Sequence, residues 1–505
     1  RSARDAVISG HRYCTVRGTV APAINFEVRL PVHGWTQRSL QTGCGGLCGF
    51  LGIRVEHDTG CTPVTDGSIV LASTDMGHTS KGFGSGDESW ASNPQMRIDF
   101  AYRGVHVTAQ VVKALMIAYY GQKPRYAYFS GCSDGGREAL IEAQRYPDDF
   151  DGIAAGAPAL NFAVQNSFYH GWMAKSNMDA SAKPIINPVD LPVLHQAALD
   201  ACDANDGLKD LQISDPRTCH FDPGIVQCKG AYEAGKCLTP EQVATARKFY
   251  GGAVDAQGHK LVVGSVMPGS ELEWAGVFVP RTNGGTIGSI NMALGTINNL
   301  LFIPNPAPGF TVNTFPFSDA ALASEEPARR LYAADNPDLS GFAAHGAKLL
   351  LWHGWSDPHI SPLNTIDYYN RVGILMGAEE RDTFVKLFLF PGMSHCGGGD
   401  GPNEFPLLAT LMAWVEDGVA PQEMVAHTVP ESTPPGMPPD LAKSDLPPAP
   451  FIARARPVYA YPLVATYKGS GDINDAASFA AAAPANVDDQ PIDWLGHRTS
   501  GAGGR

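Results

Sequence analysis

The sequence predicts an α/β fold, in which a parallel sheet is covered by helices and a second domain is inserted. Strand and helix patterns alternate between residues 126 and 160, and the alternation returns between residues 347 and 416. The stretch between them, from about residue 160 to 337, interrupts it. Alternating strands and helices are typical of parallel sheets. We therefore expect residues 1–159 and 338–484 to form one sheet-containing domain.

The composition is that of a large globular chain. Its 505 residues are 44% apolar and 17% charged. The formal net charge of -14 repels phosphate backbones and anionic membrane surfaces, so nucleic acid is not an expected partner. No apolar run approaches the ~20 residues that span a bilayer, so we expect a soluble chain without a membrane span.

The first block of the sheet contains a sharp turn between a strand and a helix. Tyr126–Ser130 is a β-prone run, Gly131–Gly136 a glycine-rich turn and Arg137–Tyr146 a helical pattern. Asp151–Gly156 then has the small, apolar character of a buried strand. This order predicts two neighbouring parallel strands joined by a helix.

The stretch 160–337 has a different pattern. It holds several short helical segments, four cysteines, an acidic loop and a glycine- and asparagine-rich stretch. We interpret it as an inserted domain, which would cover the edge of the sheet where the strands end and would determine substrate choice.

The second block repeats the strand and helix order. Ala347–Trp352 is a very apolar strand, followed by a helix over about 362–372. Val385–Phe390 is a further strand, and Phe405–Glu416 is an amphipathic helix. Both strands are expected to join the parallel sheet.

Two segments near the end of the chain are expected to be irregular. Val429–Phe451 is rich in proline, which disfavours helices and inner strands, so we predict an extended surface arm. Residues 485–505 are predicted to be a loosely held tail.

A candidate nucleophile lies in the turn after the first strand. The pattern G-x-S-x-G occurs once, as Gly131-Cys132-Ser133-Asp134-Gly135. A turn of this type strains the backbone of its serine and exposes the hydroxyl above the sheet, and it needs small residues on either side. An ordinary glycine-rich turn is the alternative interpretation.

A base and an acid follow in the order expected for parallel strands. Asp357 comes shortly after the strand Ala347–Trp352, and His395 follows the strand Val385–Phe390. A serine nucleophile needs such a base, and the base needs an orienting acid. Alone, either residue would be interpreted as a capping aspartate or a surface histidine. Together with Ser133 they predict a catalytic triad.

Two cysteines adjoin the candidate triad. Cys132 precedes Ser133, and Cys396 follows His395. If Ser133 and His395 are within hydrogen-bond reach, the cysteines are also near enough for a disulfide, whose Cα atoms lie within about 7 Å. Two unrelated buried thiols are the alternative.

The ten cysteines favour an oxidising compartment. They are even in number and several are closely spaced, which indicates disulfides more than zinc, because paired C-x2-C units are missing. We expect Cys202 to pair with Cys219 and Cys228 with Cys237. Cys14, Cys44, Cys48 and Cys61 allow three pairings. A secreted or periplasmic protein is expected.

With these residues in view, the chain resembles the tannase and feruloyl esterase family. Cys132-Ser133, Asp357 and His395-Cys396 match the family's arrangement, and so do Thr74–His78, Gly156–Pro158 and Tyr467–Asp472. The sequence also resembles the family's mono(2-hydroxyethyl) terephthalate hydrolase branch. The resemblance runs from about residue 13 to 484. It implies an α/β-hydrolase core with an inserted lid domain, and hydrolysis of carboxylic esters of aromatic acids.

The expected mechanism is acyl transfer to Ser133 and then to water. His395 removes the serine proton, and ionised Asp357 orients the imidazole. The backbone N–H of Asp134 supplies one donor to the oxyanion, and the glycine-rich loop 43–46 should supply the other. The resemblance places this second donor at Cys44.

The acidic loop 201–210 is a candidate calcium site. Its carboxylates suit a hard cation, although the spacing is not that of an EF-hand. The resemblance implies structural Ca²⁺ and these ligands: the side chains of Asp203, Asp206 and Asp210, and the carbonyls of Leu208 and Gln212. A solvated acidic loop is the alternative.

The expected substrate is a small aromatic ester, such as one attached to plant polysaccharide. The terephthalate branch binds a free carboxylate with a lid arginine, for which Arg281 is the nearest candidate here, and Ile360 stands where that branch has an aromatic residue. We therefore favour hydroxycinnamic esters, with gallate or terephthalate monoesters as alternatives. A non-catalytic binding protein and an acyl-transfer enzyme are the competing classes.

Overall fold

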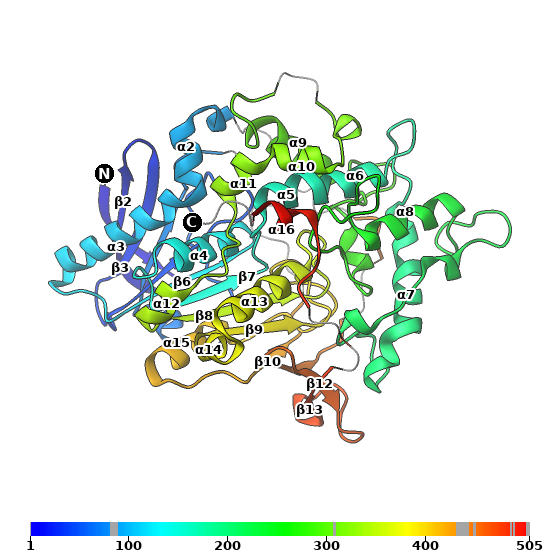
Figure 1. Ribbon diagram of the computed structural model, residues 1–505. Helices are drawn as coiled ribbons and strands as arrows, with labels where there is room; N and C mark the ends of the chain where they lie inside the picture. The colour runs from blue at the N-terminus through cyan, green and yellow to red at the C-terminus, as the bar shows by residue number, and fades with distance from the viewer. Residues whose placement is uncertain are drawn as a thin grey trace.

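The computed structural model describes residues 2–80, 89–306, 310–430, 444–447, 451–484, 487 and 490–500. Within these residues nine strands form one sheet, in the order β1-β2-β3-β5-β4-β6-β7-β8-β9 (Figure 1). The strands are β1 (Ser2–Ile8), β2 (His11–Val20), β3 (Ile24–Pro31), β4 (Arg38–Thr42), β5 (Val70–Thr74), β6 (Tyr126–Cys132), β7 (Gly152–Gly156), β8 (Lys348–Gly354) and β9 (Val385–Phe390).

The half of the sheet from β5 to β9 is parallel, as the sequence predicts. Register pairs such as Ile153 with Leu349 and Leu351 with Leu387 align the carboxyl ends of β7, β8 and β9. The predicted strands within 126–156 and 347–390 are confirmed to within about two residues. β1, β2 and β3 instead form antiparallel hairpins at the other end of the sheet, which the sequence did not predict.

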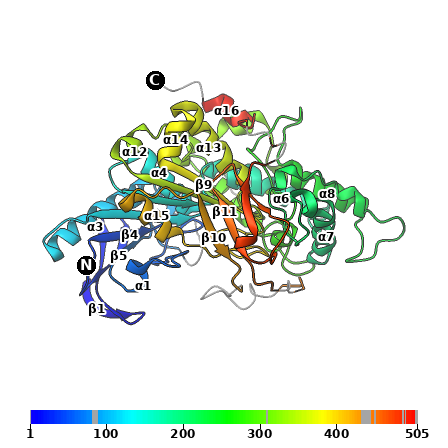
Figure 2. The ribbon, with the colours of Figure 1, turned by 90° about the horizontal axis from the view of Figure 1, so that it is seen from below.

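Helices cover both faces of the parallel strands (Figures 1 and 2). On one face α15 packs Leu411 and Trp414 against Tyr128 and Leu350. On the other face α3 and α4 pack against β6 and β7. The helices outside the insertion are α1 (Thr62–Thr65), α2 (Pro94–Ile98), α3 (Gly104–Tyr120), α4 (Asp134–Arg145), α13 (Pro362–Met376), α14 (Ala378–Phe384), α15 (Leu407–Asp417) and α16 (Leu495–Ser500).

Residues 157–347 separate β7 from β8, which are neighbours in the sheet. Their described part contributes helices and no strand of the sheet, and α6, α7 and α8 lie at the end far from β1 in both views (Figures 1 and 2). One apolar core runs through both parts, because Leu140 and Trp274 belong to the same buried cluster. The helices are α5 (Phe162–Val164), α6 (Gly171–Ser176), α7 (Leu191–Cys202), α8 (Pro240–Gly251), α9 (Gly288–Asn299), α10 (Asp319–Ser324), α11 (Glu326–Tyr332) and α12 (Ser340–His345).

The end of the chain differs from the prediction of a loose tail. In the described residues 490–500, Trp494 is 2% exposed, and Leu495 N–H donates to the carbonyl of Lys260. The burial of Trp494 and the long-range backbone hydrogen bond of Leu495 therefore anchor this segment. Most of the predicted proline-rich arm, 429–451, lies outside the described residues. The chain before and after it forms two small sheets, β10 (Glu423–His427) with β11 (Ala455–Tyr459) and β12 (Val464–Tyr467) with β13 (Phe479–Ala482). No described helix has both the length and the apolar character needed to cross a bilayer.

Four disulfides are present: Cys44–Cys48, Cys132–Cys396, Cys202–Cys219 and Cys228–Cys237. The last three are the expected pairs. The expectation that all ten cysteines pair is wrong, because Cys14 and Cys61 remain thiols. Cys14 packs on the face covered by α3 and Cys61 on the face covered by α15, so the sheet separates them.

Two thiols should therefore be measurable. Denatured, unreduced protein should react with two equivalents of a thiol reagent, at Cys14 and Cys61. In the folded protein Cys14 should react first, because Cys61 is buried and its pKa is raised to about 11 by that burial. Peptide mapping by mass spectrometry gives the positions. A Cys14–Cys61 peptide pair and no free thiol would contradict this structure.

Candidate active site

Ser133 lies in a sharp turn between β6 and α4. Its φ is 65°, in the left-handed region that is unfavourable for residues with a side chain. The turn is possible because the residues two positions before and after Ser133 are glycines: a Cβ at Gly131 would lie 2.5 Å from the carbonyl oxygen of Gly135. The backbone strain holds the serine at the carboxyl end of β6, in the conformation typical of a nucleophile elbow.

Asp357 lies in the loop after β8 and is fully buried. Its Oδ1 accepts the backbone N–H groups of His359 and Ile360 at 2.7 and 3.0 Å. Its Oδ2 lies 2.6 Å from Nδ1 of His395 and 3.1 Å from Nε2 of His353. Burial alone would raise the pKa of Asp357, but His395 and His353 hold it far below the ordinary value. The carboxylate is thus ionised and fixed against the imidazole.

A disulfide links the loop that carries His395 to the serine turn. Cys396 forms a disulfide with Cys132, and the two Cα atoms are 5.9 Å apart. Ser133 and His395 are the residues that flank this bridge. The structure therefore brings the three predicted triad segments together at the carboxyl edge of the sheet. The Ser133 hydroxyl makes no hydrogen bond within the described part of the chain. Hydrogen bonds between a catalytic serine and its base are often long in the free enzyme and tighten only when substrate is bound.

The loop that holds Cys44 packs directly on the start of α4. A Cβ at Gly43 would lie 2.6 Å from the Cα of Gly135, and a Cβ at Gly135 would lie 3.1 Å from the carbonyl oxygen of Cys44. The two backbone segments expected to stabilise an oxyanion are therefore adjacent. The N–H of Cys44 also faces Glu138 Oε1 at 3.5 Å, which is a long, weak contact.

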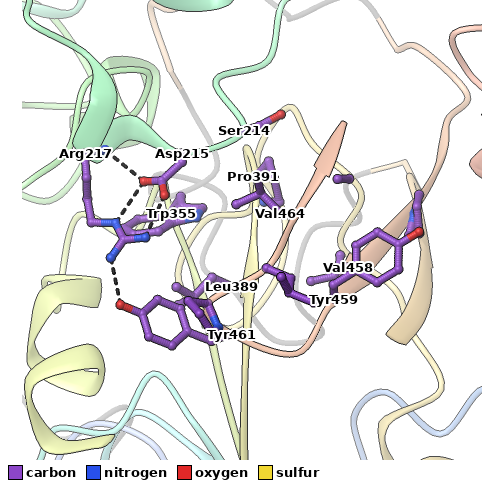
Figure 3. Close-up of a pocket in the computed structure, with 14 residues that line it drawn as sticks. Ser214, Asp215, Arg217, Trp355, Leu389, Pro391, Val458, Tyr459, Tyr461 and Val464 are labelled. Atoms are coloured by element: carbon purple, nitrogen blue, oxygen red, sulfur yellow. Dashed lines mark hydrogen bonds and ion pairs between the residues drawn. The ribbon is translucent and has the colours of Figure 1, made fainter. Parts of the chain in front are cut away.

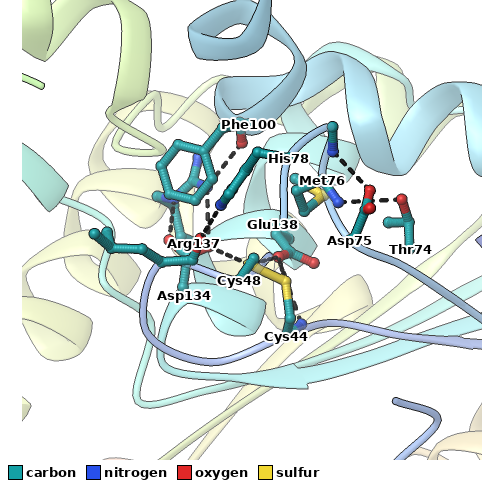
Figure 4. The surroundings of a disulfide bond; sticks show 12 residues. Cys44, Cys48, Thr74, Asp75, Met76, His78, Phe100, Asp134, Arg137 and Glu138 are labelled. Carbon is teal, nitrogen blue, oxygen red and sulfur yellow. Dashed lines mark hydrogen bonds and ion pairs between the residues drawn. A yellow bond between two sulfur atoms is a disulfide. The ribbon is translucent and has the colours of Figure 1, made fainter. Parts of the chain in front are cut away.

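Glu138 is buried beneath this loop, against the Cys44–Cys48 disulfide (Figure 4). Its Oε1 lies 2.8 Å from the Cys44 sulfur. The nearby Arg137 pairs with Asp134 at 2.6 and 3.1 Å, so its charge is already matched. Burial and the Asp134 carboxylate raise the pKa of Glu138 well above its ordinary value. A neutral acid here places no negative charge beside the backbone N–H groups that are expected to face an oxyanion.

The Thr74–His78 segment supports the same loop. The carbonyl of Asp75 accepts the N–H of Gly49 at 3.2 Å, and Nε2 of His78 lies 2.7 Å from the carbonyl of Leu47. The His78 ring stacks on Trp90 at 3.8 Å. Burial lowers the pKa of His78 to about 4, so the ring is neutral, and its contact with Leu47 holds the loop in place. This motif therefore has a positioning role.

Three residues close to the candidate triad were not found by sequence reasoning. His353 and His359 flank Asp357 in the chain, and Glu138 lies five residues after Ser133. The cluster of histidines in 353–359 was the available signal for the first two. No sequence pattern pointed to Glu138, because its role depends on contacts with a loop about ninety residues earlier in the chain.

The acidic loop of the insertion folds around Asp203. Its carboxylate accepts backbone N–H groups from 210, 211 and 212 at 3.0 to 3.3 Å. Burial, with Asp210 and Asp203 nearby, raises the pKa of Asp206. Asp210 pairs through Oδ2 with Arg456, while its buried Oδ1 has no hydrogen-bond partner among the described residues. Asp203 and Asp210 are buried and Asp206 is half-buried, and the unsatisfied oxygen of Asp210 is the feature of this loop that a hard cation would satisfy.

A separate pocket lies between the insertion and the C-terminal strands (Figure 3). Arg217 spans it, with Nε 2.9 Å from Asp215 Oδ1 and Nη1 2.8 Å from the hydroxyl of Tyr461. Trp355, Leu389 and Val458 form apolar walls. Ser133, Asp357 and His395 are not among its lining residues, so this pocket is distinct from the candidate triad.

The protonation of Glu138 can be tested through stability. A group with a raised pKa contributes stability that is present below its unfolded pKa and is lost as pH rises through its folded pKa. Glu138→Gln mimics the neutral acid, so its Tm relative to the wild type should rise as the pH increases from about 5, where an unfolded glutamate is ionised, into the alkaline range. Calorimetry over this range measures the difference, with the exposed Glu233→Gln as a matched control. A Tm deficit that stays constant over the whole range would show that Glu138 is ionised in the folded protein.

Comparisons with known proteins identify the family of this chain. The family model described as tannase and feruloyl esterase matches residues 6–482. An uncharacterized esterase from Xanthomonas campestris is 33% identical, covering 92% of this chain and 84% of its own. A mono(2-hydroxyethyl) terephthalate hydrolase from Piscinibacter sakaiensis is 32% identical, covering 94% of this chain and 85% of its own.

A solved structure gives the same result for the fold. Feruloyl esterase B from Aspergillus oryzae superposes with a TM-score of 0.78 at 28% identity, covering 95% of this chain and 92% of that one. The α/β-hydrolase fold expected from the sequence is thereby confirmed. The chain belongs to the tannase and feruloyl esterase family and is a carboxylic ester hydrolase.

Proposed function

We propose that this chain hydrolyses esters of aromatic acids, of the hydroxycinnamic (feruloyl) type, through an acyl-enzyme on Ser133. The observation that carries the proposal is the 2.6 Å contact of Asp357 with His395, on a loop covalently joined to the residue before Ser133. An ionised carboxylate, an imidazole and a strained serine on three strand ends are what acyl transfer requires. A binding protein requires none of them.

The reaction begins when His395 Nε2 accepts the Ser133 proton as the oxygen attacks the ester carbonyl. Asp357 holds Nδ1–H of the imidazole and stabilises the positive charge that forms on the ring. The same ring then donates its proton to the leaving alcohol, which leaves the acid bound to Ser133. Water, deprotonated by His395, releases the acid.

The negative charge that develops on the carbonyl oxygen is stabilised by backbone N–H groups. We assign one to Asp134, at the first position of α4, where the helix dipole adds to the effect. The second belongs to the Cys44 loop packed on Gly135. The side chain of Asp134 takes no part, since Arg137 holds it.

The substrate class is supported by the names of the relatives and by the residues around Asp357. Ile360 is buried beside the acid loop, and the only lid arginine that we identified as a candidate carboxylate ligand is Arg281, whose side chain is exposed. A neutral aromatic acyl group suits this environment better than one with a free carboxylate. Gallate esters and terephthalate monoesters are the alternatives, and an ester attached to plant polysaccharide would supply a natural source.

We also propose that the acidic loop binds structural Ca²⁺ through Asp203, Asp206 and Asp210, with the carbonyls of Leu208 and Gln212. The unsatisfied buried oxygen of Asp210, with the carboxylates of Asp203 and Asp206 in the same loop, supports this assignment. The four disulfides support secretion or a periplasmic location.

Replacement of the proposed nucleophile tests the mechanism. Ser133→Ala should lower kcat for methyl ferulate and p-nitrophenyl acetate by at least about a thousandfold, because the acyl-enzyme cannot form. Steady-state kinetics measure the loss. The matched variant is Ser356→Ala, a buried serine in the acid loop that is not in the proposed machinery. Full activity of the Ser133 variant would remove this residue from the mechanism.

Removal of calcium should affect stability more than chemistry. A chelator should lower the Tm, because a cation that binds only the folded chain stabilises it, and added Ca²⁺ should restore the Tm. Initial rates well below the Tm should change little. Asp206→Asn should make the Tm insensitive to the chelator. An unchanged wild-type Tm would contradict the site, and loss of activity in fully folded protein would indicate a catalytic metal.

A further inference from the structure

His359 lies in the loop that carries Asp357, beside the imidazole of His395. The centroids of the two rings are 4.9 Å apart. The backbone of His359 is fixed on both sides: its N–H donates to Asp357 Oδ1 at 2.7 Å, and its carbonyl accepts a hydrogen bond from the side chain of Gln165. These backbone contacts hold the ring at the candidate site without any bond from its own nitrogens.

The ring nitrogens of His359 are unsatisfied. Within the described residues neither nitrogen has a hydrogen-bond partner, and the side chain is only half-buried, so a ligand can reach it. The next ring inward is His170, with a centroid 5.7 Å away. His170 differs in that it is fully buried and its Nδ1 lies 2.8 Å from the hydroxyl of Ser289. His359 is thus the ring of this pair that is available to a ligand.

The surroundings keep His359 uncharged. Burial, His395 and the guanidinium of Arg281 lower the pKa of His359 to about 3, against the opposing effect of Asp357. Burial also lowers the pKa of His170 well below its ordinary value. A neutral imidazole presents one donor and one acceptor. It therefore adds no positive charge next to the imidazolium that His395 forms during the proposed reaction.

We propose that His359 binds a hydroxyl group carried by the ester substrate, on either its acid part or its alcohol part. The proposal rests on the esterase site proposed above. A hydroxyl group can either donate or accept a hydrogen bond, so it can pair with whichever nitrogen of the neutral imidazole faces it. A carboxylate only accepts, so it could pair with the N–H of the imidazole but not with the acceptor nitrogen. His359 is on this account a specificity-determining residue that leaves the chemistry to the triad.

Two substitutions and matched substrate pairs test the proposal. His359→Phe replaces the imidazole by an aromatic ring that has no nitrogen. His359→Gln keeps a hydrogen-bond donor and an acceptor without the ring. Methyl cinnamate against methyl p-coumarate isolates a hydroxyl on the acid, and ethyl cinnamate against 2-hydroxyethyl cinnamate isolates one on the alcohol. Ethyl acetate against 2-hydroxyethyl acetate repeats the second comparison without an aromatic group.

We expect His359→Phe to lower kcat/KM about three- to tenfold for the hydroxylated member of at least one pair, with little change for the other member. His359→Gln should restore most of the loss. The pair affected identifies the source of the hydroxyl group. Circular dichroism and turnover of p-nitrophenyl acetate verify that both variants are folded and active.

Two outcomes would overturn the proposal. An equal loss for every ester would mean that His359 acts through His395, and no loss for any would mean that its nitrogens are not used. Failure of the proposed function is recognised separately: the wild type would then hydrolyse p-nitrophenyl acetate and the acetate pair but no cinnamate. The acetate pair would still decide whether His359 binds a hydroxyl group.

Discussion

The disulfide between Cys132 and Cys396 is the constraint on which the candidate site depends. The bridge joins residues 264 positions apart in the chain. β6 and β9 are separated in the sheet by β7 and β8, so their ends lie about 14 Å apart at ordinary strand spacing. The loop after β9 must therefore turn back over two strands to reach the serine turn. Positive φ angles at Cys396, Gly398 and Gly399 allow this return, and Gly354 lets the carbonyl of Met393 pass closely above β8.

Around this bridge the other buried ionisable groups are paired or neutral, which leaves His395 as the group that gains and loses a proton in the proposed reaction. Asp357 is ionised because two imidazoles and two backbone N–H groups face it. Asp134 is matched by Arg137, while burial favours the neutral forms of Glu138 and His359. The paired and neutral groups therefore add no net charge to the candidate site, and the ionised Asp357 is the charge that His395 contacts. The imidazolium and the oxyanion of the proposed reaction would then be the charges that the surrounding dipoles respond to.

Sequence reasoning succeeded where one local pattern determines structure and failed where distant contacts do. β6, β8 and β9 are short apolar runs followed by turn residues, so their positions were predictable, and adjacency to Ser133 and His395 was enough to pair Cys132 with Cys396. The anchoring of the segment around Trp494 could not be predicted, because the neighbouring Leu495 N–H bonds to the carbonyl of Lys260, more than two hundred residues earlier in the chain. Cys14 and Cys61 could not be separated without knowing that they lie on opposite faces of the sheet. The roles of Glu138 and His359 likewise depend on loops that only the fold brings to them.

The central claim is that Ser133 is the nucleophile and that its turn is covalently tied to the histidine loop. The most direct measurement is inactivation with a fluorophosphonate, followed by proteolysis without reduction and mass spectrometry. One adduct per chain is predicted, on the Ser133 peptide, and that peptide should be recovered linked to the Cys396 peptide. An adduct on another residue, or a labelled Ser133 peptide carrying a free Cys132 thiol, would contradict the account.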